Sequence, residues 1–250
     1  MKNIILEIKN LSKYYDDSND KKNILENFNL EVENREFVCI LGPSGCGKST
    51  LIRCIAGFEK FSGEVYISGK KEIEPSTDRI MVFQDFNQLF PWKTAINNIK
   101  YPLILKGIKD KKEIDSIAKE ALSKVNLLDY ANYYPFQLSG GMKQRVAIAK
   151  AIALKPKIIL MDEPFAALDA ISRRDLQNEL LEIAEKEEIT FVFVTHNIQE
   201  AIVLGTRILV MNVGGRIAFD KKNVLERPVT PASNGYGELW QDLYDALYHG

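Results

Sequence analysis

The stretch GPSGCGKST at residues 42–50 combines glycines with a lysine and hydroxyl groups. An apolar run, EFVCIL, precedes it, and a segment with helical periodicity follows. Glycines such as Gly42 and Gly47 let backbone N–H groups curl around an anion, and the helix N-terminus adds a partial positive charge. With this spacing, Lys48 reaches the β- and γ-phosphates of a nucleotide and Ser49 holds Mg²⁺. The loop therefore predicts a nucleotide-binding site, with a glycine-rich turn before a helix as the alternative.

A second glycine-containing loop, LSGGM, occupies residues 138–142 and precedes KQRVAIAKAIAL, whose apolar residues recur with helical spacing. Small residues at the mouth of a helix again favour an anion, because the backbone N–H groups point toward it. Ser139 equally fits the residue that caps such a helix. One triphosphate hardly needs two such loops from one subunit, so a site shared between two subunits would explain both.

Two adjacent carboxylates, Asp162 and Glu163, follow the apolar run IILM. Ligand sites of α/β sheets lie at the carboxyl ends of the strands. At that place Asp162 suits Mg²⁺, directly or through water, and Glu163 suits a general base or a water-orienting group. The alternative is a solvated turn, which the apolar run before the pair and Pro164 after it disfavour.

Four other polar or aromatic side chains allow two interpretations each. His196 ends TFVFVTH and Gln84 ends RIMVFQ, so each is either a ligand of a bound group or an ordinary polar residue at a strand end. Tyr14 and Tyr15 precede a charged stretch. Either ring could pack in the core or stack on a base.

The composition excludes several classes of protein. The 250 residues are 46% hydrophobic and 27% charged, which is typical of a soluble globular chain and not of disorder, collagen or a coiled coil. Lysine and arginine number 33 against 34 acidic residues, so no global basic field for nucleic acid is predicted. Cys39, Cys46 and Cys54 match no zinc or redox spacing and indicate reduced thiols in a cytosolic protein. No apolar run approaches the about 18 residues of a membrane span.

The order of the predicted elements indicates an α/β fold. Strands come first, a helical stretch follows from about 85 to 156, and strands then alternate with helices. KIILM and TFVFV are apolar at nearly every position, as in a buried parallel sheet, whereas 24–32 alternates, as in an antiparallel sheet with one wet face. We therefore expect an α/β core that carries an antiparallel β layer and a helical insertion. Residues 4–9 are expected to form an edge strand, 16–23 a solvated loop and 221–250 a loosely held tail.

Taken together, these motifs resemble the nucleotide-binding subunit of an ABC transporter. The resemblance rests on their order: an aromatic near the start, GPSGCGKST, Gln84, LSGGMKQR, IILMDEP, the pair LD at 168–169, and His196. LSGG between a phosphate loop and an acidic pair separates this family from other P-loop NTPases. The resemblance covers residues 1–220 approximately and implies a single P-loop NTPase domain with an ABC-type core, followed by the tail 221–250.

The resemblance implies a role for each matching residue. Tyr15 stacks on adenine, Glu163 polarises the attacking water, His196 contacts the γ-phosphate, and Asp169 lies in the loop that joins two ATP sites. The residues that wrap the phosphates are Gly42, Pro43, Ser44, Gly45, Cys46, Gly47, Lys48, Ser49 and Thr50. The Mg²⁺ ligands are Ser49, Gln84 and, through water, Asp162. The residues that reach the ATP of a partner subunit are Ser139, Gly140, Gly141 and Gln144.

The resemblance also implies partners. Two ATP molecules are sandwiched in a head-to-tail homodimer, or in a heterodimer with a sister ATPase, at the cytoplasmic face of the membrane. A separate permease spans the membrane. The stretch QDFNQLFPWKTAINNI is similar to that of ATPases of importers for nitrate, sulfonates and taurine, which adds an extracytoplasmic binding protein as an indirect partner. Its Trp92 offers an apolar surface to the permease, with ordinary packing as the alternative. Four positions replace the usual Gly, Leu, Gly and Asp: Arg35, Phe90, Ala166 and Asn197.

Three other functions are compatible with the same predicted ATP site. A soluble ABC ATPase of translation or DNA repair usually carries two such domains, long coiled coils or zinc sites, and the sequence contains none of these. An exporter subunit stays open, because separate-chain exporters exist. A regulatory pseudo-ATPase is disfavoured, since Lys48, Asp162, Glu163 and His196 are all present.

Overall fold

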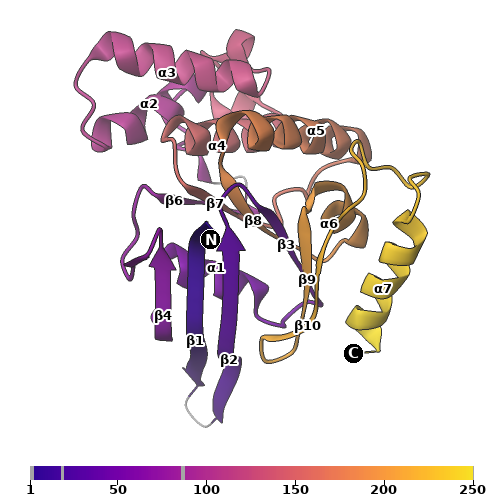
Figure 1. Cartoon of the computed structure of the whole chain (residues 1–250). Helices are drawn as coiled ribbons and strands as arrows, with labels where there is room; N and C mark the ends of the chain where they lie inside the picture. Colours follow the sequence, from indigo (N-terminus) through magenta and orange to yellow (C-terminus); the bar gives the residue numbers. More distant parts are fainter. Residues whose placement is uncertain (1–2, 18–19, 86–87, 250) are drawn as a thin grey trace.

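The computed structural model describes residues 3–17, 20–85 and 88–249 (Figure 1). Its central sheet has six strands, in which five run parallel and the last, at one edge, is antiparallel. The order across the sheet is β10 (Arg216–Lys222), β9 (Arg207–Asn212), β3 (Phe37–Leu41), β8 (Thr190–Thr195), β7 (Ile158–Asp162) and β6 (Arg79–Val82).

Both faces of the inner strands β3, β8 and β7 are buried, which explains why these strands are nearly continuous apolar runs, whereas the edge strand β10 is mostly exposed. In β3, the side chains of Phe37, Cys39 and Leu41 enter one hydrophobic cluster, whereas those of Val38 and Ile40 enter the other. Successive side chains of a strand point to opposite faces, so a sheet covered on both sides needs an apolar residue at every position. The expectation of an α/β core with buried parallel strands is confirmed.

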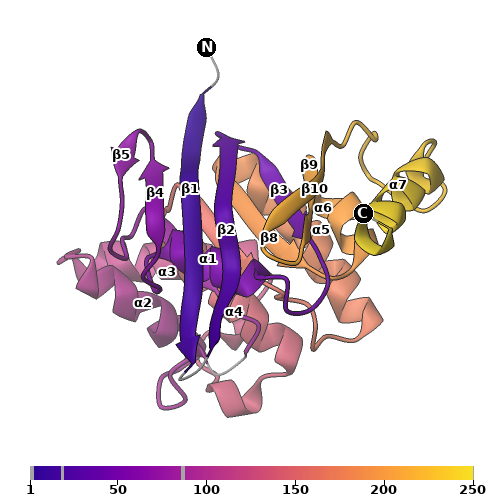
Figure 2. The same ribbon diagram turned by 90° about the horizontal axis from the view of Figure 1, so that it is seen from below.

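A second, antiparallel sheet covers one side of the molecule (Figure 2). Its order is β2 (Asp20–Glu33), β1 (Ile4–Asp17), β4 (Ser62–Ile67) and β5 (Lys70–Lys71). The antiparallel layer is thus confirmed, but β1 lies between β2 and β4, and the prediction of an edge strand is wrong. A strand's own alternation reveals its buried face, not how many neighbours it has. The predicted loop at 16–23 is largely strand, with residues 18 and 19 outside the described part.

Helix α1 (Lys48–Ala56) lies between the two sheets (Figure 2). Leu51, Ile52 and Ile55 are fully buried there, together with side chains from both sheets. This packing joins the start of α1 rigidly to the end of β3, and therefore holds the loop between them.

Helices cover the opposite face of the central sheet (Figure 1). The segment predicted as a helical insertion is confirmed as helical, and part of it projects beyond the sheet as α2 and α3. The helices of this layer are α2 (Ala95–Leu105), α3 (Lys111–Lys124), η2 (Leu128–Tyr130), η3 (Pro135–Gln137), α4 (Gly140–Ala153), α5 (Ala170–Glu187), α6 (Ile198–Leu204) and α7 (Tyr236–Tyr248).

The C-terminal part is packed, so the expectation of a loosely held tail is wrong. Leu239 and Leu243 of α7 are buried in the helical-side core, beside α6 and β9. The Asn223 side chain donates to the carbonyls of Ile202 and Gly205, at 2.8 and 2.9 Å. Pro228, Pro231 and Gly235 precede α7 and Gly237 is in its first turn, and the i, i+4 spacing of the two leucines was the overlooked helical signal.

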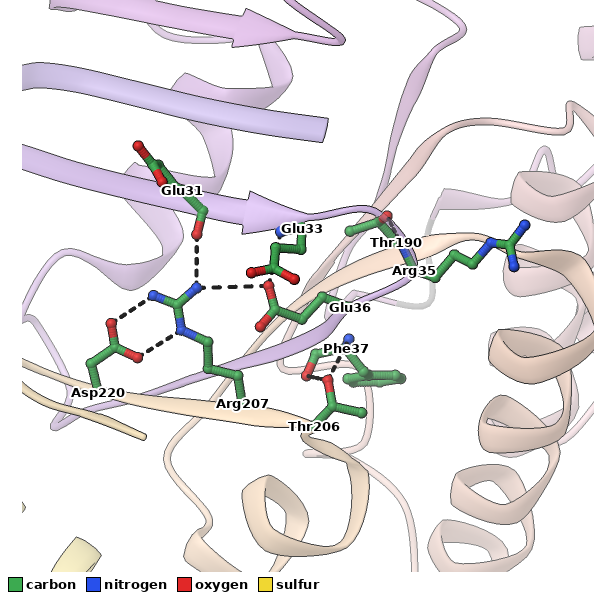
Figure 3. A network of polar contacts seen from close by, with 9 residues as sticks. All are labelled: Glu31, Glu33, Arg35, Glu36, Phe37, Thr190, Thr206, Arg207 and Asp220. Atoms are coloured by element: carbon green, nitrogen blue, oxygen red, sulfur yellow. Dashed lines mark hydrogen bonds and ion pairs between the residues drawn. The ribbon is translucent and has the colours of Figure 1, made fainter. Parts of the chain in front are cut away.

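Arg207 connects the two sheets through its side-chain contacts (Figure 3). Its Nε and Nη2 donate to the two carboxylate oxygens of Asp220, at 2.7 and 2.6 Å, and its Nη1 donates to the carbonyl of Glu31 at 2.8 Å. Hydrogen bonding to Asp220 raises the pKa of the guanidinium. Because Glu31 is in β2 and Asp220 in β10, this one side chain links the antiparallel sheet to the central sheet.

The structure shows how the chain accommodates Arg35 at a position where glycine is usual. Its φ of 64° lies in the left-handed region, where glycine is favoured because it has no Cβ. The turn is nevertheless held by the Arg35 N–H, which donates to Thr190 Oγ1 at 2.9 Å, and by an ion pair with Glu188 at 2.6 Å. The substitution thus alters a turn of the scaffold and no group of the predicted site.

Candidate active site

The phosphate loop connects the end of β3 to the start of α1. Gly42 has no room for a side chain, because a Cβ there would collide with the carbonyl oxygen of Met211. Gly47 caps α1 with a φ of 108°, a value that side chains rarely allow. The two fixed glycines of the motif are therefore required by this backbone.

Lys48 lies inside the loop, with only 5% of its surface exposed. Its Nζ donates to the carbonyls of Gly42 and Pro43, at 2.7 and 3.0 Å. The ammonium group and the N-terminus of α1 thus place positive charge at the same point. This arrangement suits the phosphates of a nucleotide, as the sequence predicts.

Ser49, in the first turn of α1, lies next to Asp162, the last residue of β7. The Ser49 hydroxyl donates to Asp162 Oδ1 at 2.8 Å. Burial raises the pKa of Asp162, and the hydrogen bond from Ser49 opposes that effect. A hydroxyl beside a carboxylate offers the hard oxygen ligands that Mg²⁺ prefers. The predicted third ligand, Gln84, is exposed just after β6, the strand that pairs with β7.

We predict that Asp162→Asn will raise the melting temperature of the nucleotide-free protein while abolishing Mg²⁺-dependent ATP hydrolysis. The native carboxylate is ionised in a buried place, and its raised pKa means that ionisation opposes folding. A gain of ~1 kcal/mol would raise the melting temperature by about 2–4 °C.

Thermal unfolding as a function of pH tests this prediction. The gain should be present at pH 7 and vanish at acidic pH, where the native Asp162 is protonated in both states. A lower melting temperature for the variant at neutral pH would contradict it.

Glu163 and His196 form a hydrogen-bonded pair at the ends of two neighbouring parallel strands. His196 Nδ1 lies 2.9 Å from Glu163 Oε2. Glu163 has a left-handed φ of 43°, and its N–H donates to the carbonyl of Val194 at 3.1 Å. The turn thus directs the carboxylate away from the strand axis and toward the histidine. A carboxylate held by an imidazole can orient a water molecule and accept its proton.

The second glycine loop opens α4. Ser139 is the N-cap residue, and its Oγ accepts a hydrogen bond from the Met142 N–H at 3.3 Å. The capping interpretation is therefore correct. It leaves the predicted contact with a second ATP open, because Ser139 is exposed and Gly140 and Gly141 are partly so.

Gln144 does not fit its predicted role. It is fully buried within its own chain, where its amide donates to the carbonyl of Phe83 at 3.4 Å and accepts from Gln88 at 3.3 Å. The structure contradicts the expectation that Gln144 contacts a partner subunit. Instead it connects α4 to the segment that carries Gln84.

The remaining predicted residues lie at the surface. Tyr15 is 39% exposed on β1, where its hydroxyl donates to Glu59 at 3.2 Å and Lys13 lies 4.6 Å from its ring centroid. It is therefore not a core residue, and stacking on a base remains the prediction. Asp169 caps α5, since its Oδ1 accepts from the N–H groups of Ile171 and Ser172, both at 3.0 Å.

Sequence reasoning overlooked Asn98, which is fully buried in α2. Its amide accepts from the N–H of Phe90 at 2.7 Å and donates to the carbonyls of Phe90, Lys93 and Thr94, at 3.2, 3.0 and 3.1 Å. A single polar residue on the apolar face of a predicted helix was the available signal.

The comparisons with known proteins decide the family. The model of the ABC transporter family matches residues 25–166, more than half of the chain. The chain belongs to the ABC transporter family.

Relatives of this ABC protein are similar over nearly all its length. The uncharacterised ABC transporter ATP-binding protein MJ0412 of Methanocaldococcus jannaschii is 48% identical over 97% of this chain and 91% of the relative. The aliphatic sulfonates import ATP-binding protein of Bacillus thuringiensis is 41% identical over 98% and 96%. A dimeric ATP-binding cassette, MJ0796, solved in a post-hydrolysis state with ADP and phosphate, has a TM-score of 0.78 at 38% identity, covering 87% of this chain and 98% of the other.

This ABC subunit is an ATPase. Its nucleotide loop, acidic pair and histidine gather at the carboxyl ends of neighbouring strands, and the family model spans the loop and the pair. Among the described residues, no helix is both long and apolar enough to cross a bilayer.

Proposed function

We propose that this ABC ATPase powers the import of a small anion, such as a sulfonate, through a separate permease at the cytoplasmic face of a membrane. The observation that carries the proposal is the 41% identity, over 98% of the chain, to the ATP-binding protein of a sulfonate importer. An extracytoplasmic binding protein would deliver the anion to the permease.

ATP hydrolysis would proceed on the residues gathered at the strand ends. The loop N–H groups and Lys48 bind the phosphates, and Tyr15 stacks on the base. Glu163 orients the attacking water and accepts its proton, while His196 keeps that carboxylate in place through the 2.9 Å contact. Mg²⁺ held by Ser49, Gln84 and Asp162 would neutralise charge on the phosphate oxygens.

A second copy of the chain would complete the site. Ser139 is exposed and Gly140 and Gly141 are partly exposed at the start of α4, where backbone N–H groups suit a phosphate bound by the partner. The similarity to a cassette solved as a dimer with ADP and phosphate supports a head-to-tail homodimer. Hydrolysis would then separate the two copies, since the γ-phosphate contacts both.

The permease would contact the segment around Trp92. This side chain is 70% exposed, so it is not part of the chain's own core. Phe90 packs against Trp92 and Tyr101, with ring centroids 5.5 and 5.2 Å apart. Asn98 holds the backbone beneath them through its four hydrogen bonds. The result is a rigid aromatic surface close in sequence to Gln84.

We predict that Trp92→Ala will abolish transport and co-purification with the permease while the purified subunit keeps its basal ATPase activity. Truncating a buried aromatic at an interface costs about 2 kcal/mol or more, which weakens binding by over tenfold. The control is Tyr248→Ala, which removes an equally exposed aromatic, 65% accessible, from the far end of α7.

The measurement is a pull-down of the tagged chain from detergent-solubilised membranes in the presence of ATP, with the co-purifying chains identified by mass. A permease together with a binding protein supports import, and a permease alone points to export. Equal loss of ATPase activity and transport in Trp92→Ala would contradict the coupling role.

A further inference from the structure

A cavity of about 430 Å³ lies between α5, α6 and the segment that follows β10. Its wall combines the cations Arg173 and Arg174, one carboxylate, that of Glu200, and several amides with the apolar side chains of Val203 and Val229. Small-molecule sites typically have volumes of roughly 300–1,000 Å³ and a mostly apolar wall with a few polar groups. The lining therefore suits a small organic anion with an apolar body.

Arg174 has unused capacity for such an anion, and Arg173 has one nitrogen without a hydrogen-bond partner although it is ion-paired with Glu200. Arg174 is exposed and forms neither an ion pair nor a hydrogen bond with any residue in the described part of the chain. Arg173 Nε is shielded from solvent, yet no described residue accepts a hydrogen bond from it. The nearest carboxylate oxygen, Glu200 Oε1, is 3.7 Å away. A buried donor without a partner is costly, so a movement of Arg173 that brings Nε to an acceptor on a ligand would be favoured.

Arg173 also touches the catalytic elements. Its Nη2 donates to the carbonyl of Leu168 at 3.0 Å, directly before Asp169. Arg173 and Glu200 also line a second, smaller cavity, whose wall includes Glu163 and His196. One guanidinium therefore lies between the larger cavity and the catalytic pair.

Glu200 continues this connection toward His196. Its Oε2 accepts a hydrogen bond from Thr195 Oγ1 at 2.7 Å, and Thr195 directly precedes the histidine. The same Thr195 oxygen accepts from the Asn197 N–H at 3.0 Å. The Thr195 hydroxyl thus holds the turn around His196 and links this turn to Glu200.

We propose that this cavity binds a small organic sulfonate or carboxylate, which forms an ion pair with Arg173 and slows ATP hydrolysis. The anion would bind Arg174 at the exposed rim and Arg173 deeper in the wall. Pulling Arg173 away from the Leu168 carbonyl and from Glu200 loosens the two turns that carry Asp169 and His196. The ligand would act as a regulator, and the proposal depends on the ATPase activity alone, not on import.

The test uses 8-anilino-1-naphthalenesulfonate, a fluorescent aromatic sulfonate, with the full-length protein. We expect one probe molecule per chain and a fall in kcat with little change in KM for ATP. Arg174→Gln should weaken probe binding about tenfold, because it removes one charge-assisted hydrogen bond. Arg216→Gln is the matched control, since Arg216 is an exposed arginine outside the cavity.

Val203→Trp provides a second, independent variant, because the larger side chain would fill the cavity from α6. It should abolish probe binding. Unchanged probe affinity in Arg174→Gln would overturn the proposal even if Val203→Trp does not fold. Displacement of the probe by ATP would also overturn it, since that result would place the probe in the nucleotide site. Failure to co-purify a permease would leave this result unaffected.

Discussion

Replacing Glu163 with glutamine is expected to lower the turnover of ATP by about 10²–10⁴-fold, the usual contribution of one positioned base. Glutamine has the same shape but cannot accept the proton of the attacking water. The phosphate loop and Lys48 are untouched, so the affinity for ATP should stay within a few-fold of the native value.

Steady-state hydrolysis and equilibrium binding of ATP, measured on the same preparations, separate the two effects. Glu182→Gln is the matched control, because this glutamate is 67% exposed on α5 and pairs only with Lys186 among the described residues. A Glu163→Gln enzyme with near-normal turnover would exclude Glu163 as the base.

The second large effect is expected at Gly42. Gly42→Ala forces a methyl group against the carbonyl oxygen of Met211, a backbone atom of β9 that cannot move without its strand. Overpacking of this kind costs ~1–3 kcal/mol, and relief of the collision must displace the phosphate loop. We therefore expect both a lower melting temperature and ATP binding weakened by about tenfold or more.

Gly237→Ala provides a control with the opposite sign. Gly237 lies in the first turn of α7, and nothing lies within 4 Å of a Cβ added there. Alanine should stabilise that helix by about 0.5–1 kcal/mol and leave ATP binding unchanged. Unaltered ATP affinity in Gly42→Ala would show that the loop tolerates the extra methyl group, contrary to the packing argument.

The sequence alone predicted the central sheet and the placement of its chemistry. The nearly continuous apolar runs of β3, β7 and β8 could only be buried on both faces. The polar residues that end such strands must meet at one edge of the sheet. The contact of Glu163 with His196 follows from that rule, and Ser49 reaches the end of β7 from the first turn of α1.

Other features depend on contacts between distant segments. Gln144 was grouped with the glycines of its loop by proximity in sequence, but its side chain is buried in the core, where it accepts a hydrogen bond from Gln88. The neighbours of β1 depend on pairing with β4, which local alternation does not report. Arg173 carries no sequence signal, because its significance arises only from the carbonyl and carboxylate that the fold brings to it.

The buried amide of Asn98 has a mechanical consequence. By bonding three carbonyls and one N–H of residues 90–94, it makes this segment and α2 a single stiff body. A push on Trp92 cannot then be absorbed by bending of the segment. It must displace α2, which packs against α4, the helix that opens with the second glycine loop. Asn98 thus links the surface around Trp92 to the helix that opens with the second glycine loop.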